Sequence, residues 1–171
     1  RSRIFQFYKV DRDSARAIIE FVLWDLYSYL STKGNKKFPK VVVLDEIQNL
    51  DLSPDAPVAK YFAEGRKHGI SLITATQSLK QIGGASSANM FQADMKLFFR
   101  PSEPEMKEHA QMLHNVIQDH SIADWIKRLS DLQKGECWAL GRFMNYAKNE
   151  LITQALKIRI SSLEERGFHG Q

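Results

Sequence analysis

The sequence predicts an α/β fold with a mostly parallel sheet, helices on both faces of that sheet and an antiparallel edge at the C-terminus. Three observations carry this prediction. Strand-like and helix-like patterns alternate over residues 4–115, which is typical of parallel sheets with crossover helices. The run Val41–Leu44 is aliphatic without alternation, as in a strand buried on both faces. The last two strand patterns have no helix between them, so we expect them to pair antiparallel.

The first half of the chain begins with an alternating pattern at residues 4–10, which predicts a strand. A helix is then expected from Asp13 or Ser14 to about Leu30, because apolar residues recur at helical spacing. Residues 33–37 form a polar loop that leads to the aliphatic strand. A helix over 58–67 follows, and Gly69 ends it.

The second half starts with a short apolar strand over residues 70–75, a glycine- and serine-rich loop over 83–87 and a strand over 96–99. Ser102–Glu105 has the residues of a capping box with Pro104 in the first turn, so we expect a helix through about Leu113. A similar start at Ser121 predicts a helix to about Leu129. The two final strands are expected at 136–140 and 153–160.

Composition narrows the class of protein. The chain has 171 residues and a net charge of +4, which fits a single domain over residues 1–171 and permits contact with a polyanion. The single Cys137 has apolar neighbours and reads as a buried thiol of a reducing, cytoplasmic compartment. No apolar run approaches the length of a membrane span, so no membrane association is expected. The chain begins with Arg1 rather than Met, and we expect it to be cut from a longer protein.

Two carboxylates directly follow the aliphatic strand, in the sequence VVVLDE. Ligands of open α/β sheets bind beyond the carboxyl ends of the strands. Asp45 is therefore predicted to hold Mg²⁺, which proteins bind through one or two carboxylates together with substrate phosphates. Glu46 is predicted to accept a proton from the water that attacks a γ-phosphate. The alternative is that both residues simply end a buried strand and enter solvent.

A second polar segment, Thr74–Gln77, follows the next strand. If that strand lies beside the first, Gln77 is placed to hydrogen-bond the γ-phosphate or the attacking water. The alternative is a loop residue without such a role.

Three segments together resemble a known family: VVVLDEIQNL, AEGRKHGISLITATQSL and KLFFRPSEPE. Their order and spacing are similar to those of the HerA/FtsK-like branch of the additional-strand P-loop ATPases, including proteins of bacterial phosphorothioation-dependent restriction. The resemblance implies the C-terminal half of a RecA-like core, with Asp45 as the Walker B aspartate, Glu46 as the catalytic glutamate and Gln77 as the sensor. It also implies ATP and Mg²⁺ as cofactors.

The same resemblance implies partners. Such proteins assemble as rings, usually hexamers, and translocate duplex DNA, and those of defence systems work with nuclease or other subunits. A neighbouring subunit supplies an arginine to the γ-phosphate, a role that suits the planar, always charged guanidinium. The candidates here are Arg100, which follows the strand over 96–99, and Arg66, near the end of the helix over 58–67. A solvated or salt-bridged arginine is the alternative for either.

The chain departs from the family at one motif. A phosphate-binding loop needs the pattern GxxxxGK[ST], and no Lys follows a Gly anywhere in this sequence. We therefore expect the loop to lie upstream of Arg1 and the isolated chain to be inactive towards ATP. Two other readings stay open: a non-hydrolysing interaction domain of the same fold, and a conjugation or secretion ATPase.

Overall fold

The computed structural model describes residues 3–7, 9–79, 82 and 93–167. The chain divides into two compact units, Arg1–Gln92 and Ala93–Gln171. Both contain helices and a sheet, so the chain is an α/β protein, as the sequence predicts. The prediction that residues 1–171 form one domain stays a prediction, and the loop expected over 83–87 lies outside the described residues.

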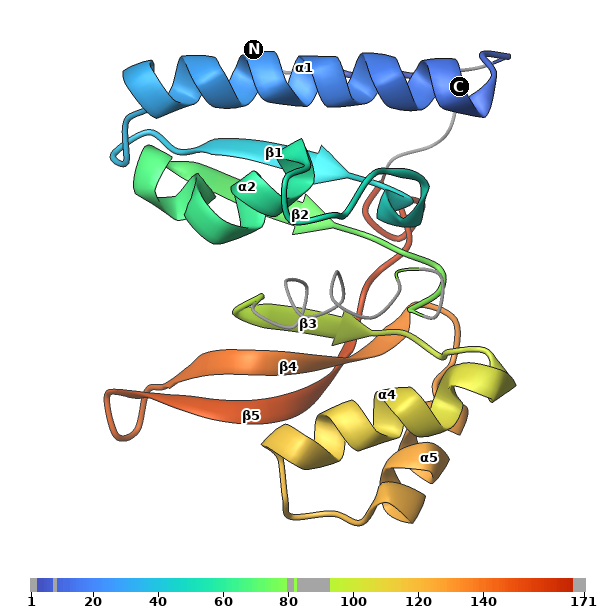
Figure 1. The fold of residues 1–171 in the computed structure, drawn as a ribbon. Helices are drawn as coiled ribbons and strands as arrows, with labels where there is room; N and C mark the ends of the chain where they lie inside the picture. Colours follow the sequence, from blue (N-terminus) through green and yellow to red (C-terminus); the bar gives the residue numbers. More distant parts are fainter. Residues whose placement is uncertain (1–2, 8, 80–81, 83–92, 168–171) are drawn as a thin grey trace. The chain divides into compact units, whose positions relative to one another are not determined.

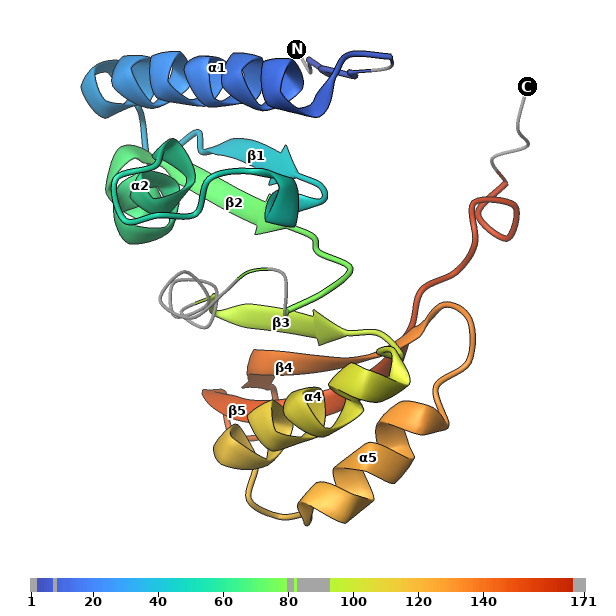
Figure 2. The ribbon, with the colours of Figure 1, turned by 45° about the vertical axis from the view of Figure 1, so that its right-hand side comes forward.

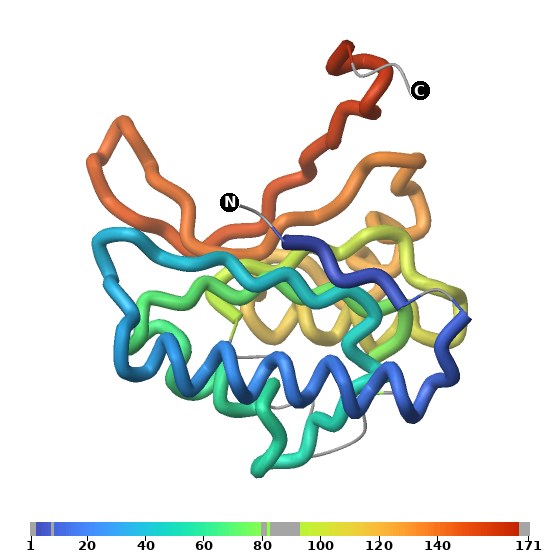
Figure 3. The backbone as a smooth tube through the Cα atoms, turned by 90° about the horizontal axis from the view of Figure 1, so that it is seen from above, coloured from blue at the N-terminus to red at the C-terminus, as the bar shows by residue number. Residues whose placement is uncertain are grey.

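Unit 1 is built on a pair of parallel strands. Helix α1 (Arg12–Lys33) leads to strand β1 (Lys40–Leu44), and a 3-10 turn η1 (Ile47–Asn49) comes before helix α2 (Pro57–Glu64). A second 3-10 turn, η2 (Gly65–His68), then leads to strand β2 (Ile70–Thr74). Strands β1 and β2 pair in parallel, with Lys40 opposite Ile70 and Leu44 opposite Thr74. Figure 3 shows the chain reversing between α1 and β1.

The start of α1 and the reversal that follows it have local causes. The side chain of Asp11 accepts a hydrogen bond from the backbone N–H of Ser14 at 2.9 Å and so caps the helix. At Gly34 the chain passes so close to its neighbours that a Cβ would lie 2.1 Å from the carbonyl oxygen of His68. Gly69 has a φ of +72° and packs against the backbone of Asn35. Two glycines thus let the loop before β1 and the turn before β2 approach each other.

Both helices of unit 1 pack on the same face of the β1–β2 pair (Figures 1 and 2). Their shared cluster consists of Leu23, Leu30, Val42, Val58, Tyr61 and Ile70. On the other face, Val41, Val43 and Ile73 are 58%, 65% and 55% exposed. The prediction of helices on both faces of this strand is therefore wrong for unit 1, because α1 and α2 share one face.

Unit 2 is an antiparallel sheet of three strands with two helices. Strand β3 (Met95–Phe98) pairs with β4 (Glu136–Asn145), and β4 pairs with β5 (Glu150–Arg159). The helices α4 (Glu103–Val116) and α5 (Ile122–Ser130) lie between β3 and β4 in the sequence. Helix α5 begins with the capping box that the sequence indicates, because the side chains of Ser121 and Asp124 each bond the other's backbone N–H.

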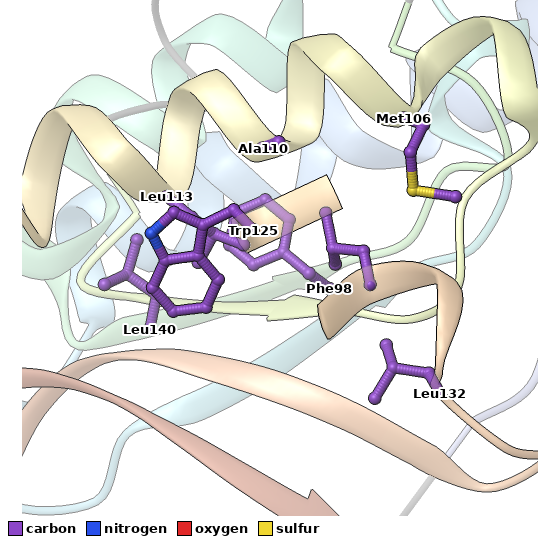
Figure 4. Packing of buried hydrophobic residues seen from close by; sticks show 8 residues of the cluster. Phe98, Met106, Ala110, Leu113, Trp125, Leu132 and Leu140 are labelled. Atoms are coloured by element: carbon purple, nitrogen blue, oxygen red, sulfur yellow. The ribbon is translucent and has the colours of Figure 1, made fainter. Parts of the chain in front are cut away.

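The core of unit 2 lies between these helices and one face of the sheet (Figures 1 and 4). Its buried members are Phe98, Met106, Ala110, Leu113, Trp125, Leu129, Leu132 and Leu140. The predicted antiparallel pairing of the last two strands is confirmed over ten residue pairs.

Two further expectations are wrong. Strand β3 does not extend a parallel sheet, because its partner is β4, in antiparallel register from Met95–Gly141 to Phe98–Trp138. "Mostly parallel" therefore holds only for the β1–β2 pair among the described strands. The described part of residues 4–10 forms no strand, and Ile4 and Phe5 are 90% and 59% exposed. An alternating pattern becomes a strand only where a neighbour supplies backbone hydrogen bonds.

Candidate functional site

The candidate site lies where the chain leaves β1 and β2. Because the two strands are parallel, their carboxyl ends meet at one edge of the sheet. Backbone pairing continues beyond the strands: the N–H of Ala75 donates to the carbonyl of Leu44 at 2.9 Å, and the N–H of Ile47 donates to the carbonyl of Ala75 at 3.1 Å. Residues 45–49 are thereby held beside residues 75–77. We call these two segments the carboxylate edge.

Glu46 is the centre of the carboxylate edge. Its backbone has a φ of +52°, in the left-handed region that residues other than glycine rarely adopt. One carboxylate oxygen, Oε1, accepts a hydrogen bond from the side-chain amide of Gln77 at 2.7 Å. The other, Oε2, accepts one from the side-chain amide of Asn49 at 3.3 Å. The structure thus brings together two of the predicted residues, Glu46 and Gln77, across the ends of two strands.

Asn49 is a site residue for which the sequence argument gave no role. It lies three residues after Glu46, in the 3-10 turn η1, and that spacing places two side chains on the same face of a helical turn. Gln48 takes part as well, because the hydroxyl of Thr76 donates to its Oε1 at 2.8 Å. The signal was in the sequence: an acid followed after two residues by an amide, directly after a strand.

Asp45 is exposed and fits the role of a metal ligand. Its Oδ1 accepts a hydrogen bond from the backbone N–H of Glu46 at 2.9 Å, and Oδ2 has no hydrogen-bond partner among the described residues. The described chain holds no group of three or more His, Cys, Asp or Glu side chains that could by itself enclose a metal ion. A single carboxylate suits Mg²⁺, which keeps several waters and takes its other ligands from substrate phosphates.

Neither candidate arginine belongs to the two segments of the carboxylate edge. Arg66 is exposed in η2, just before the amino end of β2, while the carboxylate edge follows its other end. A Cβ at Gly65 would lie 3.4 Å from Ile70, the first residue of β2, so Arg66 follows a residue packed at the amino end of that strand, whereas Gln77 lies beyond its carboxyl end. Arg100 is exposed in unit 2, after β3, where it lines a cleft of about 310 Å³ with Lys134 and Glu136.

Cys137 is fully buried, and burial raises the pKa of its thiol. It therefore behaves as a small apolar core residue rather than as a nucleophile or a metal ligand.

A scan against models of protein families gives no match, and a search of curated proteins finds no similar sequence. Within the described residues, no helix combines the length and the apolar character that crossing a bilayer requires.

Proposed function

We propose that this chain carries the catalytic edge of an ATPase that moves DNA, of the HerA/FtsK-like type and with a RecA-like core. The observation that carries the proposal is the 2.7 Å hydrogen bond between Gln77 and Glu46, which joins the ends of two parallel strands. It gives a candidate base and a candidate sensor a common position where α/β sheets bind ligands. The setting we propose is a cytoplasmic DNA-processing or restriction and defence system.

The chemistry assigned to the edge follows from its residues. Mg²⁺ and ATP, when bound, supply the electrophilic γ-phosphorus and neutralise charge on the phosphates. Asp45 would hold the metal through its free oxygen. Glu46 would take the proton of the attacking water, and Gln77 would orient either the Glu46 carboxylate or that water.

An oligomeric ring accounts for the missing cation in this proposal. Among the described residues, no Lys or Arg side chain makes an ion pair with Asp45 or Glu46. Arg66 lies at the opposite end of β2 from the carboxylate edge, so it serves a nucleotide only if it reaches the site of a neighbouring subunit. Arg100 remains the second candidate for that role.

A second candidate function is a non-hydrolysing interaction domain of the same fold. It is favoured by the state of Glu46, whose two carboxylate oxygens both accept hydrogen bonds from side-chain amides. A carboxylate has about four lone-pair sites, so the two amide bonds occupy part of its accepting capacity, and a general base would work through the sites that remain. A conjugation or secretion ATPase would use the same edge and differ in the polymer that it moves.

The decisive experiment uses a protein that joins this chain to a phosphate-binding loop. In it, Glu46→Gln should leave ATP binding nearly unchanged while hydrolysis falls about 10²–10⁴-fold, the usual loss when a general base is removed. Glu108→Gln, an exposed change of the same kind in α4, is the control and should leave turnover unchanged. Unchanged turnover in Glu46→Gln would assign Glu46 a structural role, whereas ATP binding without turnover in the parent protein would favour the interaction domain.

A further inference from the structure

A second cleft lies in unit 2, against the core. It has a volume of about 310 Å³ and is lined by residues of α5, β4, β5 and the segment that follows α4. Trp125 and Arg128 come from α5, Trp138 from β4, Gln154 from β5 and His120 from the segment after α4. All its lining residues belong to one unit, so the cleft does not depend on how the two units are placed.

Trp125, one of the residues that line the cleft, has a buried donor that is unpaired among the described residues. Trp125 is 1% exposed, and its indole N–H has no hydrogen-bond partner among the described residues. Figure 4 shows the indole nitrogen turned toward the Leu113 end of α4 and away from Met106. That end of α4 continues into Ile117, which also lines the cleft. A buried donor without an acceptor is destabilising, because it loses its bond to water and gains none in return, so such a group calls for a specific partner.

The lining of the cleft also holds a cation without a close counter-charge. The guanidinium carbon of Arg128 lies 5.7 Å from the ring centre of Trp125 and 5.5 Å from that of Trp138. The two indole rings are nearly perpendicular, with centres 5.3 Å apart. No carboxylate of the described residues lies within ion-pair distance of Arg128.

The neighbouring groups favour an acceptor-bearing ligand over a cation. Gln154 and Thr153 add polar groups to the lining, and Ile117 and Ala155 add apolar surface. Among the described residues of the lining, the only carboxylate is that of Asp119, whose side chain is 65% exposed and 3.8 Å from Nε2 of His120. The cleft, at about 310 Å³, is much larger than the roughly 30 Å³ that one water molecule occupies in the liquid, so it has room for a small organic molecule.

We propose that this cleft binds a small organic anion, whose carboxylate or phosphate oxygens accept hydrogen bonds from Arg128 and from the indole N–H of Trp125. The apolar body of the ligand lies against the indole rings and Ile117. Arg128 sets the charge preference, because its fork of donors matches a carboxylate or a phosphate. The site is independent of the carboxylate edge, which belongs to unit 1.

The test follows the indole N–H signal of Trp125 by two-dimensional ¹H–¹⁵N NMR on the whole chain. Benzoate and phenyl phosphate are the anionic probes, and benzyl alcohol is the neutral probe of similar size. We expect a saturable downfield shift with at least one anion at millimolar concentration and none with benzyl alcohol. Preference between the two anions tells carboxylate from phosphate.

Two matched variants make the test specific. Arg128→Gln should weaken binding about 10–100-fold, which corresponds to the roughly 1.5–3 kcal/mol of a hydrogen bond to a charged group. Arg142→Gln, an equal change of charge at an exposed position of β4, should leave it unchanged. If Arg128→Gln loses the dispersed spectrum of a folded chain, Trp125→Phe takes its place, read through the indole of Trp138.

Three results would overturn the proposal. The first is that neither anion gives a saturable shift of the Trp125 N–H signal, as expected if a buried water is the only partner of that N–H. The second is an equal response to benzyl alcohol. The third is equal weakening by Arg128→Gln and Arg142→Gln, which would show general charge attraction rather than a site.

Discussion

The backbone of Glu46 makes a prediction that can be tested without any nucleotide. Its φ of +52° lies in the left-handed region, which costs a residue with a Cβ about 1–2 kcal/mol and glycine almost nothing. Glycine also loses about 0.5–1 kcal/mol more than alanine through its freedom in the unfolded chain. Glu46→Gly should therefore be more stable than Glu46→Ala by roughly 0.5–1 kcal/mol.

Comparing the two variants removes the other effects of the substitution. Both lose the hydrogen bonds from Gln77 and Asn49, so those losses cancel. Ala17, exposed within α1 beyond its first turn, is the control, and Ala17→Gly should cost about 0.5–1 kcal/mol. The difference in unfolding free energy between the glycine and alanine variants should thus change by roughly 1–2 kcal/mol from position 17 to position 46.

The assay is urea denaturation of the whole chain, followed by far-ultraviolet circular dichroism. The order of midpoints decides the matter: Glu46→Gly above Glu46→Ala, and Ala17→Gly below the parent chain. If Glu46→Ala is as stable as Glu46→Gly while Ala17→Gly shows its ordinary loss, the left-handed backbone at Glu46 is refuted. The proposed geometry of the carboxylate edge would fall with it.

Three further outcomes are expected. In the protein that includes a phosphate-binding loop, subunits that lack the acting arginine can be mixed with Glu46→Gln subunits, and the mixed oligomers should regain ATPase activity. If no mixture regains activity, the proposal of an arginine supplied by the neighbouring subunit is wrong. Leu113→Ala should destabilise unit 2 by about 2–5 kcal/mol by thermal denaturation, since Leu113 is fully buried, whereas Leu151→Ala, at 59% exposure, should change little. The hydrogen bond from the Lys157 side chain, followed by that from the backbone N–H of Gln133, lowers the pKa of Glu136 from 4.5. The free energy of unfolding of the parent should therefore exceed that of Lys157→Gln at pH 7, and the difference should shrink as the pH falls below 4.5. A difference that does not change with pH would show that this pair is not the cause.

The elements of this fold were largely predictable where local signals are strong. The capping residues at Ser121 and the apolar spacing of α1 depend on neighbours within one helical turn, and both helices form. The parallel pairing of β1 with β2 follows from the helix between them, since a crossover is what parallel neighbours require. Such features are decided by residues close in sequence.

The partner of each strand was less predictable, because pairing is decided by residues distant in sequence. The run over 96–99 reads like any short apolar strand, and nothing in it specifies β4 as an antiparallel neighbour. The aliphatic run Val41–Leu44 suits a strand covered on both faces, yet α1 and α2 both pack on the side of Val42. Periodicity reports how apolar a face is and does not report what covers it.

In the candidate site too, features decided by neighbours in sequence were predictable and features decided by the fold were not. The acids after β1 and Gln77 after β2 were predictable, because parallel strands place their carboxyl ends together. Asn49 was not assigned, since its role depends on the 3-10 turn that follows Glu46 and on the unusual backbone at Glu46 itself.

The left-handed backbone of Glu46 decides the direction of its carboxylate. Successive side chains of an extended chain point in opposite directions, so an extended Glu46 would alternate with Asp45. The turn at Glu46 instead directs its carboxylate to the amides of Gln77 and Asn49. A backbone cost of about 1–2 kcal/mol persists only where surrounding contacts offset it, and residues of this kind gather at functional sites. The strain and the two amide donors are therefore parts of one arrangement that fixes the direction of the Glu46 carboxylate at the edge of the sheet, and loss of either donor should free that side chain before the fold itself is affected.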